Sequence, residues 1–214
     1  MFVLEEIYKS KKPENSDHFN LRFQRSLSWF KKATQLEEDI DLKFMSLWVS
    51  LNAAYAQEIG KTLDNQGFKL FLSDVLKADQ EHKIYHLVWD KLSPLMSRII
   101  ESPYTFQLFW DQQNKTISQM AWKDAFEIEK KQIHQAVQSK DTLTLLFVVF
   151  NRLITLKNQL QQGGSTYNSA INRKQLYEGC MILSAILPRL LFILLENPAK
   201  FDLGKPFYPV QQMS

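Results

Sequence analysis

The chain has 214 residues, of which 45% are hydrophobic, and its formal net charge is +3 at pH 7. This is enough apolar material for a sizeable core in one domain, while the weakly basic balance permits RNA as a partner but does not by itself predict it. A single cysteine, Cys180, excludes an internal disulfide framework and a multi-cysteine zinc site and fits a reducing, cytoplasmic setting.

Chain-breaking residues are few, with 6 Gly and 7 Pro and no low-complexity linker, so we predict one helical domain over residues 1–214. Residues 1–16 are interpreted as an N-terminal extension without the apolar run of a signal peptide. The first helix is expected over residues 17–36, with Arg22 and Arg25 on its flank. Apolar residues recur there at steps of three and four: Phe19, Phe23, Leu27, Phe30 and Ala33.

Next along the chain, residues 39–60 predict a helix that starts at Asp39 or Asp41 as N-cap and stops at Gly60. Its apolar face is expected to carry Phe44, Leu47, Trp48, Leu51 and Tyr55. Residues 68–79 and 81–101 predict two further helices, with Pro94 bending or ending the second. Ser102 and Pro103 are typical of the start of another helix.

The second half of the sequence continues the helical pattern. Residues 116–139 predict a charged helix with one solvated face, and residues 141–164 a largely apolar helix that is capped by Asp141 and ends in a left-handed turn at Gly163. The last long helix is expected over residues 172–196. Its apolar part is shorter than a membrane span and contains Pro188 and Arg189, so a buried helix is favoured over a membrane one.

No sustained alternation of apolar and polar residues predicts a strand. The sequence therefore predicts an all-α bundle, with the helices over residues 39–60, 141–164 and 172–196 at its centre. Residues 197–214 are expected to form an extended tail, because of their prolines. Aromatic residues at helical spacing, including Trp29, Trp48 and Trp89, are assigned to the core.

One short segment, "KNQLQQGG", carries a candidate binding site at the end of an apolar helix. Lys157, Asn158 and Gln162 are expected within about one turn of each other, on one face near the helix end, and Gly163 and Gly164 allow a backbone or ligand to come close. Such a cluster could hold a phosphate. The alternative is a solvated helix end, where a lysine favours the negative end of the helix dipole.

The stretches "LRFQRSLSWFKKA", "DLKFMSLWVSLNAAYA", "RLITLKNQLQQGGSTYNSAINRKQL" and "NPAKFDLGKPFYPV" resemble those of HEPN-domain proteins, a compact all-helical family associated with RNA cleavage in toxin-antitoxin and antiviral systems. The family's signature is an arginine, a polar residue that is often asparagine, about three variable residues and a histidine, commonly followed by two glycines. Here Asn158, Gly163 and Gly164 agree with it, whereas Lys157 replaces the arginine and Gln162 the histidine.

The two departures bear on chemistry. Metal-independent RNA cleavage needs a group that exchanges protons near neutrality, as histidine does, and a cation that stabilises the developing charge. Gln162 does not titrate, and Lys157 keeps the charge but lacks the planar fork of arginine. We therefore expect a HEPN-like endoribonuclease site that is weakened or inactive, by natural degeneration or by engineering, with no cofactor.

The resemblance also implies a homodimer in which two copies of Lys157, Asn158 and Gln162 form one composite site. Further RNA contacts are expected from Arg152, Tyr167, Arg173 and Lys174. An antitoxin or another defence protein is a possible partner. Two alternatives stay open: a non-catalytic module for dimerisation or partner binding, and a residual nuclease that works through Lys157.

Other motifs point to no second chemistry. His82 and His86 have the spacing of metal ligands, but no third ligand is evident beyond Glu81 or Asp90, so no metal site is assigned. Cys180 lies in an apolar helix and is interpreted as buried and inert. The glycine-rich loops of ATPases and dehydrogenases do not occur.

Overall fold

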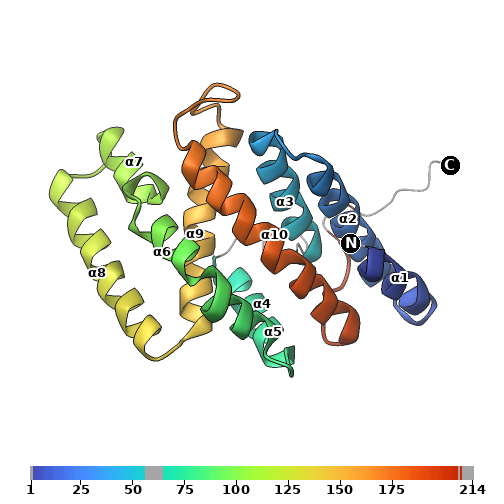
Figure 1. The fold of residues 1–214 in the computed structure, drawn as a ribbon. Coiled ribbons are helices and arrows are strands. Elements are labelled where there is room, and N and C mark those ends of the chain that lie inside the picture. Colours follow the sequence, from blue (N-terminus) through green and yellow to red (C-terminus); the bar gives the residue numbers. More distant parts are fainter. Residues whose placement is uncertain (1, 56–64, 207, 209–214) are drawn as a thin grey trace.

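The computed structural model describes residues 2–55, 65–206 and 208, and all regular elements within these ranges are helical (Figure 1). The prediction of an all-α fold is therefore confirmed. The longer helices are α1 (Phe2–Lys11), α2 (Asp17–Gln35), α3 (Ile40–Tyr55), α4 (Asn65–Ala78), α6 (Ser93–Glu101), α7 (Gln107–Gln113), α8 (Gln119–Gln138), α9 (Thr142–Gln161) and α10 (Arg173–Glu196). The shorter helical segments are η1 (Lys12–Glu14), α5 (Lys83–His86), η2 (Leu87–Leu92) and η3 (Pro103–Thr105).

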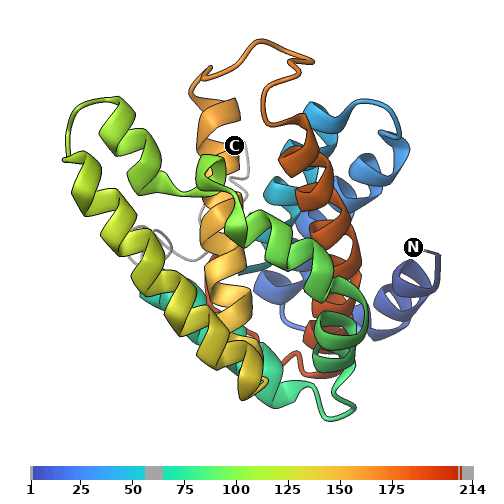
Figure 2. The same cartoon turned by 60° about the vertical axis from the view of Figure 1, so that its left-hand side comes forward.

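Helices α9 and α10 occupy the middle of the molecule (Figures 1 and 2). The hairpin of α7 and α8 flanks α9 on one side, and α3, α2 and α1 follow on the side of α10. Of the predicted central helices, α3 contacts both α9 and α10. The loop that joins α9 to α10 projects from one end of the bundle, next to the start of α3.

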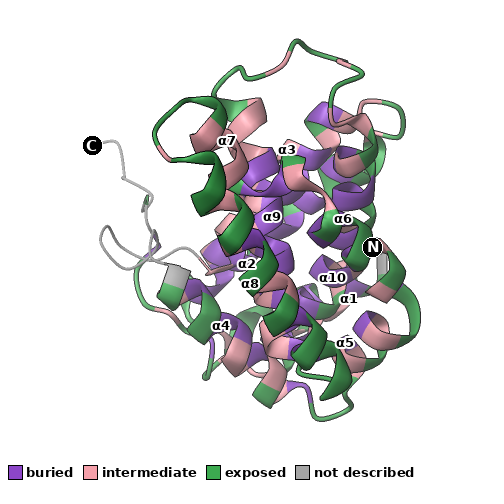
Figure 3. Cartoon of the chain, turned by 90° about the vertical axis from the view of Figure 1, so that its left-hand side faces the viewer, coloured by how far each residue is buried: buried purple, intermediate pink, exposed green. Residues whose placement is uncertain are grey.

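A single cluster of buried apolar side chains extends from Leu4 in α1 to Phe201 beyond α10, and Figure 3 shows the buried positions on the inner faces of α9 and α10. At its centre, a Cβ on Gly179 would lie 2.8 Å from Phe44 and 3.0 Å from Leu153. These are closer than side chains normally approach, so glycine at this position lets α10 pack tightly against α3 and α9.

The predicted helix starts can be checked at their caps. The carboxylate of Asp39 accepts the backbone N–H of Leu42 at 3.0 Å, and that of Asp141 accepts the N–H of Thr144 at 3.0 Å, so both residues act as N-caps. The predicted stop at Gly60 lies outside the described residues. After Ser102 the structure differs from the prediction, because η3 forms first and α7 begins only at Gln107.

Residues 83–101 form one nearly continuous helical path that changes type along its length. The π-helical segment η2 precedes α6, and Pro94 lies in the first turn of α6. Proline fits the first turn because it has no N–H to donate there, and the wider π turn before it avoids the clash that an interior proline causes. The predicted bend at Pro94 therefore takes the form of a change in helix type.

One expectation about burial was wrong, and the burial of two other features was not predicted. Trp29 is not a core residue, since it is 44% exposed, whereas Arg22, expected on the flank of its helix, is only 2% exposed. The segment interpreted as an extension contributes the buried side chains Leu4 and Tyr8 to the core. The periodicity of α2 places Arg22 beside its apolar stripe, and only the packing of a distant segment decides its burial.

That distant segment is the C-terminal tail. Arg22 donates from Nη2 to the carbonyl of Gly204 at 3.0 Å, and Arg25 donates to the carbonyl of Tyr208 at 2.6 Å. Burial lowers the pKa of the Arg22 guanidinium. The two arginines thus hold the tail against α2, which is a structural role.

Within the described residues one helix, Arg173–Glu196, is long and apolar enough to cross a membrane by length and composition. About 67% of its most apolar window is buried inside the protein, which is typical of a core helix.

Candidate nucleic-acid interface

The motif segment forms the last turn of α9 and the turn that follows it. The backbone N–H of Gln162 donates to the carbonyl of Asn158 at 2.9 Å, and Gln162 is the C-cap. Gly163 has φ +70°, which confirms the predicted left-handed helix end. A Cβ on Gly164 would lie 3.1 Å from the carbonyl oxygen of Gln159, so the second glycine permits a close approach of the chain to α9.

An open cleft of about 410 Å³ lies beside this turn, between α9, α8 and the segment that joins η3 to α7. Asn158 and Gln162, four residues apart on one face of α9, both line it, together with Thr155 about one turn and Asn151 about two turns before Asn158. The lining is therefore rich in hydrogen-bonding groups. Its charged members are Arg152 and Glu129.

Lys157, which was expected on the same face as Asn158 and Gln162, does not line this cleft. Its side chain is half-buried on the neighbouring face of α9, and no hydrogen bond or ion pair joins it to another described residue. Burial lowers the pKa of the Lys157 ammonium from its ordinary value. In one copy of the chain the structure thus brings Asn158 and Gln162 together in a cleft and leaves Lys157 outside it.

Arg152, expected to touch RNA directly, is only 2% exposed and forms an ion pair with Glu129 of α8. Its guanidinium carbon lies 4.2 Å from the ring centre of Phe106 and 5.2 Å from that of Phe126. Burial lowers the pKa of Arg152 to about 10, although Glu129 opposes the shift, so the guanidinium stays charged at neutral pH. Arg152 therefore joins α8 to α9 at the floor of the cleft.

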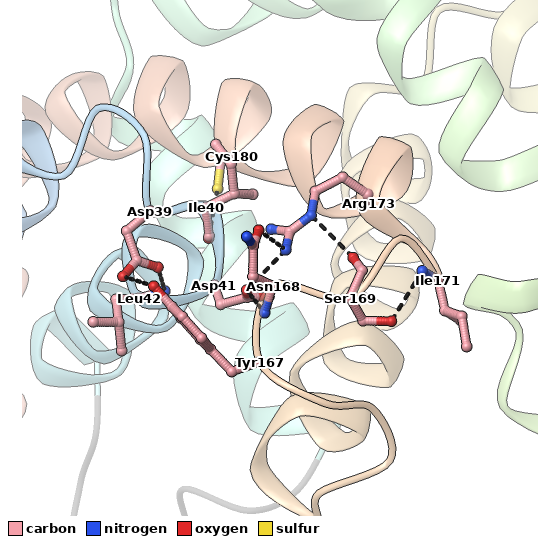
Figure 4. A network of polar contacts seen from close by, with 10 residues as sticks. All are labelled: Asp39, Ile40, Asp41, Leu42, Tyr167, Asn168, Ser169, Ile171, Arg173 and Cys180. Carbon is pink, nitrogen blue, oxygen red and sulfur yellow. Dashed lines mark hydrogen bonds and ion pairs between the residues drawn. The ribbon is translucent and has the colours of Figure 1, made fainter.

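Arg173 and Tyr167 hold the loop between α9 and α10 onto the start of α3 (Figure 4). Arg173 donates to Asp41 at 3.0 Å, to the side chain of Asn168 at 2.8 Å and to the carbonyl of Ser169 at 3.1 Å. The hydroxyl of Tyr167 donates to Asp39 at 2.7 Å, while the residue stays 70% exposed. The two side chains thus have structural partners, and the exposed surface of Tyr167 is still open to a ligand.

Lys174, the last of the expected contacts, is exposed at the start of α10. It lines a separate shallow hollow of about 290 Å³ with Tyr104, Arg98 and Glu178. In that hollow Arg98 and Glu178 form an ion pair at 2.5 Å. The structure does not bring Lys174 to the cleft of Asn158 and Gln162.

Two residues that matter for the site were missed from the sequence. Glu129 supplies the charge opposite Arg152, and Gln159 ties the motif to its surroundings by donating to the carbonyl of Tyr104 at 2.9 Å and accepting from Asn172 at 2.6 Å. Glu129 lies 23 residues before Arg152, and only the packing of α8 against α9 could have revealed the pair. Gln159 was within the motif, but its spacing gave no sign of its partners.

The remaining candidates offer no metal chemistry. His86 lies 3.1 Å from Asp90, and His82 has a left-handed backbone with φ 52° just before α5. In the parts of the chain that the structure describes, no group of three or more His, Cys, Asp or Glu side chains could hold a metal ion. Cys180 is buried, and burial raises the pKa of its thiol to about 12, so the thiolate is strongly disfavoured.

The cleft can therefore bind through amide groups and a buried cation, but Asn158 and Gln162 cannot exchange protons near neutrality. No protein-family model matches this chain, and no curated protein or solved structure is significantly similar to it.

Proposed function

We propose that this protein is a HEPN-like, RNA-targeting protein of the toxin-antitoxin or antiviral type, whose metal-independent endoribonuclease site is weakened or inactive. The single observation that carries the proposal is the last turn of α9. It places Asn158 and Gln162, two positions of the motif, on one open polar cleft, while the residue at the histidine position is an amide that does not titrate.

Chemistry supports binding without efficient cleavage. Amide groups donate and accept hydrogen bonds, so Asn158 and Gln162 can hold RNA oxygens or base edges. Loss of general acid–base help typically costs a factor of about 10² to 10⁴ in rate. Lys157, which is half-buried and without an ion-pair partner among the described residues, supplies a positive charge next to the cleft.

In this proposal two copies of the chain place their Lys157 side chains at one composite site, as the family resemblance implies. This would give Lys157 a role that a single copy of the cleft does not provide. Analytical ultracentrifugation at micromolar concentration should then show a dimer, and a strictly monomeric protein would exclude the composite site.

The RNA-binding part is tested by fluorescence anisotropy with a labelled single-stranded RNA at two salt concentrations. We expect binding that weakens as salt rises, no cleavage in the presence of a chelator, and a salt slope smaller by about 1 in the variant Lys157→Ala. Lys12→Ala is the matched control, because Lys12 is exposed in η1, between α1 and α2, and η1 lies away from α9. Equal losses in the two variants would contradict a specific role for Lys157.

A second candidate function is a non-catalytic module that binds a partner protein such as an antitoxin. Exposed apolar side chains favour it: Ile171, Tyr177 and Met181 in the loop and the first turns of α10 are 62%, 53% and 41% exposed. Under this alternative RNA does not bind even at low salt, and Tyr177→Ser with Met181→Ser abolishes association with the partner. The anisotropy experiment therefore separates the two functions.

A further inference from the structure

We propose that the cleft over Arg152 is a binding site for a phosphoryl group, with the buried guanidinium as its cationic partner and the carboxamides of Asn151, Asn158 and Gln162 as neutral donors. The inference deepens the proposed function, on which it rests for RNA as the source of the phosphate. The phosphoryl site itself can be tested without RNA.

The first argument is the unsatisfied guanidinium. Arginine has five N–H donors, and here Nη2 donates to Glu129, while Nε and Nη1 are buried and have no acceptor among the described residues. Leaving charged donors buried without acceptors is costly, so Arg152 gains from additional oxygen atoms. Phe106 and Phe126 pack against the guanidinium and hold it in place.

The second argument is the set of free amides. The side chains of Asn151, Asn158 and Gln162 line the cleft, and none of the three makes a hydrogen bond to another described residue. Thr155, in contrast, already uses its hydroxyl to donate to the carbonyl of Asn151 at 3.3 Å. The oxygen atoms of a phosphoryl group are mainly acceptors, which suits three unused carboxamide NH₂ groups beside an arginine.

The third argument concerns how the ligand would enter. Glu129 is the sole carboxylate among the residues that line the cleft, and its side chain is 24% exposed, against 2% for Arg152. Glu129 is therefore closer to solvent than Arg152. Because Nε and Nη1 are buried while the ion pair is closed, a phosphoryl group would have to displace Glu129, which acts as an internal competitor.

This competition gives the inference a distinctive test. The melting temperature (Tm) of the full chain is measured against inorganic phosphate, with sodium chloride balancing the ionic strength, for the wild type and for Glu129→Gln. We expect phosphate to raise the Tm with a saturating dependence on its concentration, which non-specific stabilisation by an excluded anion does not show. Glu129→Gln should tighten the apparent Kd for phosphate by about tenfold, because the competing charge is gone. A purely structural ion pair predicts no such gain.

Two sets of variants control this measurement. Glu127→Gln removes the same charge from an exposed position on the same helix, where Glu127 pairs with Lys130 at 2.9 Å, and should leave the Kd for phosphate unchanged. Arg152→Met removes the guanidinium and should abolish phosphate binding. Asn151→Ala and Asn158→Ala should each weaken the binding several-fold, and they keep the test valid if Arg152→Met does not fold. Equal Tm values in phosphate and chloride, or an equal gain from Glu127→Gln, would overturn the proposal.

The source of the phosphate is resolved with two further probes, a 5′-mononucleotide and a dinucleotide with one internal phosphodiester. Binding of the dinucleotide with the same response to Glu129→Gln supports the RNA backbone as ligand. Binding of the mononucleotide alone supports a phosphoryl site but contradicts the RNA backbone. Phosphate binding by a wild-type protein that binds no RNA would support the phosphoryl site and contradict the proposed RNA function, so the two proposals can fail separately.

Discussion

Arg152 in α9 and Arg173 at the start of α10 were both expected to touch RNA, but the structure gives them opposite surroundings. Arg173 is half-buried and donates to three acceptors, on Asp41, Asn168 and Ser169. Arg152 is almost fully buried and has one acceptor, on Glu129. The fold thus supplies three acceptors to the more exposed arginine. The buried arginine, next to the cleft, has two nitrogen donors without an acceptor among the described residues.

The contrast teaches that the exposure of a cation does not identify a binding residue. The partners of Arg173 lie on its own loop and at the start of α3, and the network closes that loop onto the bundle (Figure 4). The partner of Arg152 is Glu129 of α8, and the nitrogens Nε and Nη1 of Arg152 have no acceptor among the described residues. Function is therefore better sought at the unsatisfied arginine.

The largest effect is expected from Arg152→Met. It leaves the Glu129 carboxylate without its cation between packed helices, and we expect the free energy of unfolding to fall by about 3 kcal/mol. Urea denaturation measures the loss. The double variant Arg152→Met with Glu129→Gln should recover part of it, because the unpaired charge is then also removed. If Arg152→Met is as stable as the wild type, the ion pair does not hold α8 to α9.

A smaller and more local effect is expected from Arg173→Met. It removes an ion pair at the rim of the bundle, and we expect a loss of about 1 kcal/mol. Hydrogen exchange should show faster exchange of the backbone N–H of Asn168, which now donates to Asp41 at 2.9 Å. Protection of this amide that is unchanged in the variant would mean that the loop is held by other contacts.

The smallest effect on stability is expected from Lys174→Ala. Lys174 is exposed and makes no ion pair with another described residue, so the free energy of unfolding should change by less than about 0.5 kcal/mol. This variant is the baseline against which the two arginines are compared in the same urea series. A loss as large as that of Arg173→Met would show that Lys174 has a structural role.

Much of the fold followed from local patterns. The caps at Asp39 and Asp141 and the left-handed end at Gly163 are properties of short stretches, and the structure confirms them. The burial of Arg22 and the exposure of Trp29 depend on what covers each side chain from elsewhere in the chain. Helical periodicity assigns a residue to a face but not to a neighbour.

In the candidate site, too, the local arrangement of residues was predictable from the sequence, whereas the long-range contacts were not. Asn158 and Gln162 share a face because they are four residues apart, and the structure places both on one cleft. The expectation that Lys157 shares this face was wrong, because consecutive residues of an α-helix point in different directions. The pairing of Arg152 with Glu129 and the anchoring of Arg173 by Asp41 join residues that are 23 and 132 positions apart, and local spacing carries no information on such contacts.

In the proposed function, the motif at the end of α9 is a ribonuclease site that has lost its proton-transfer group. This proposal is tested most directly by the variant Lys157→Arg with Gln162→His, incubated with single-stranded RNA in the presence of a chelator. We predict cleavage at least about 10²-fold faster than with the wild type, because a histidine and an arginine are restored at the motif positions. A folded double variant that leaves the RNA as intact as the wild-type protein does would contradict the account.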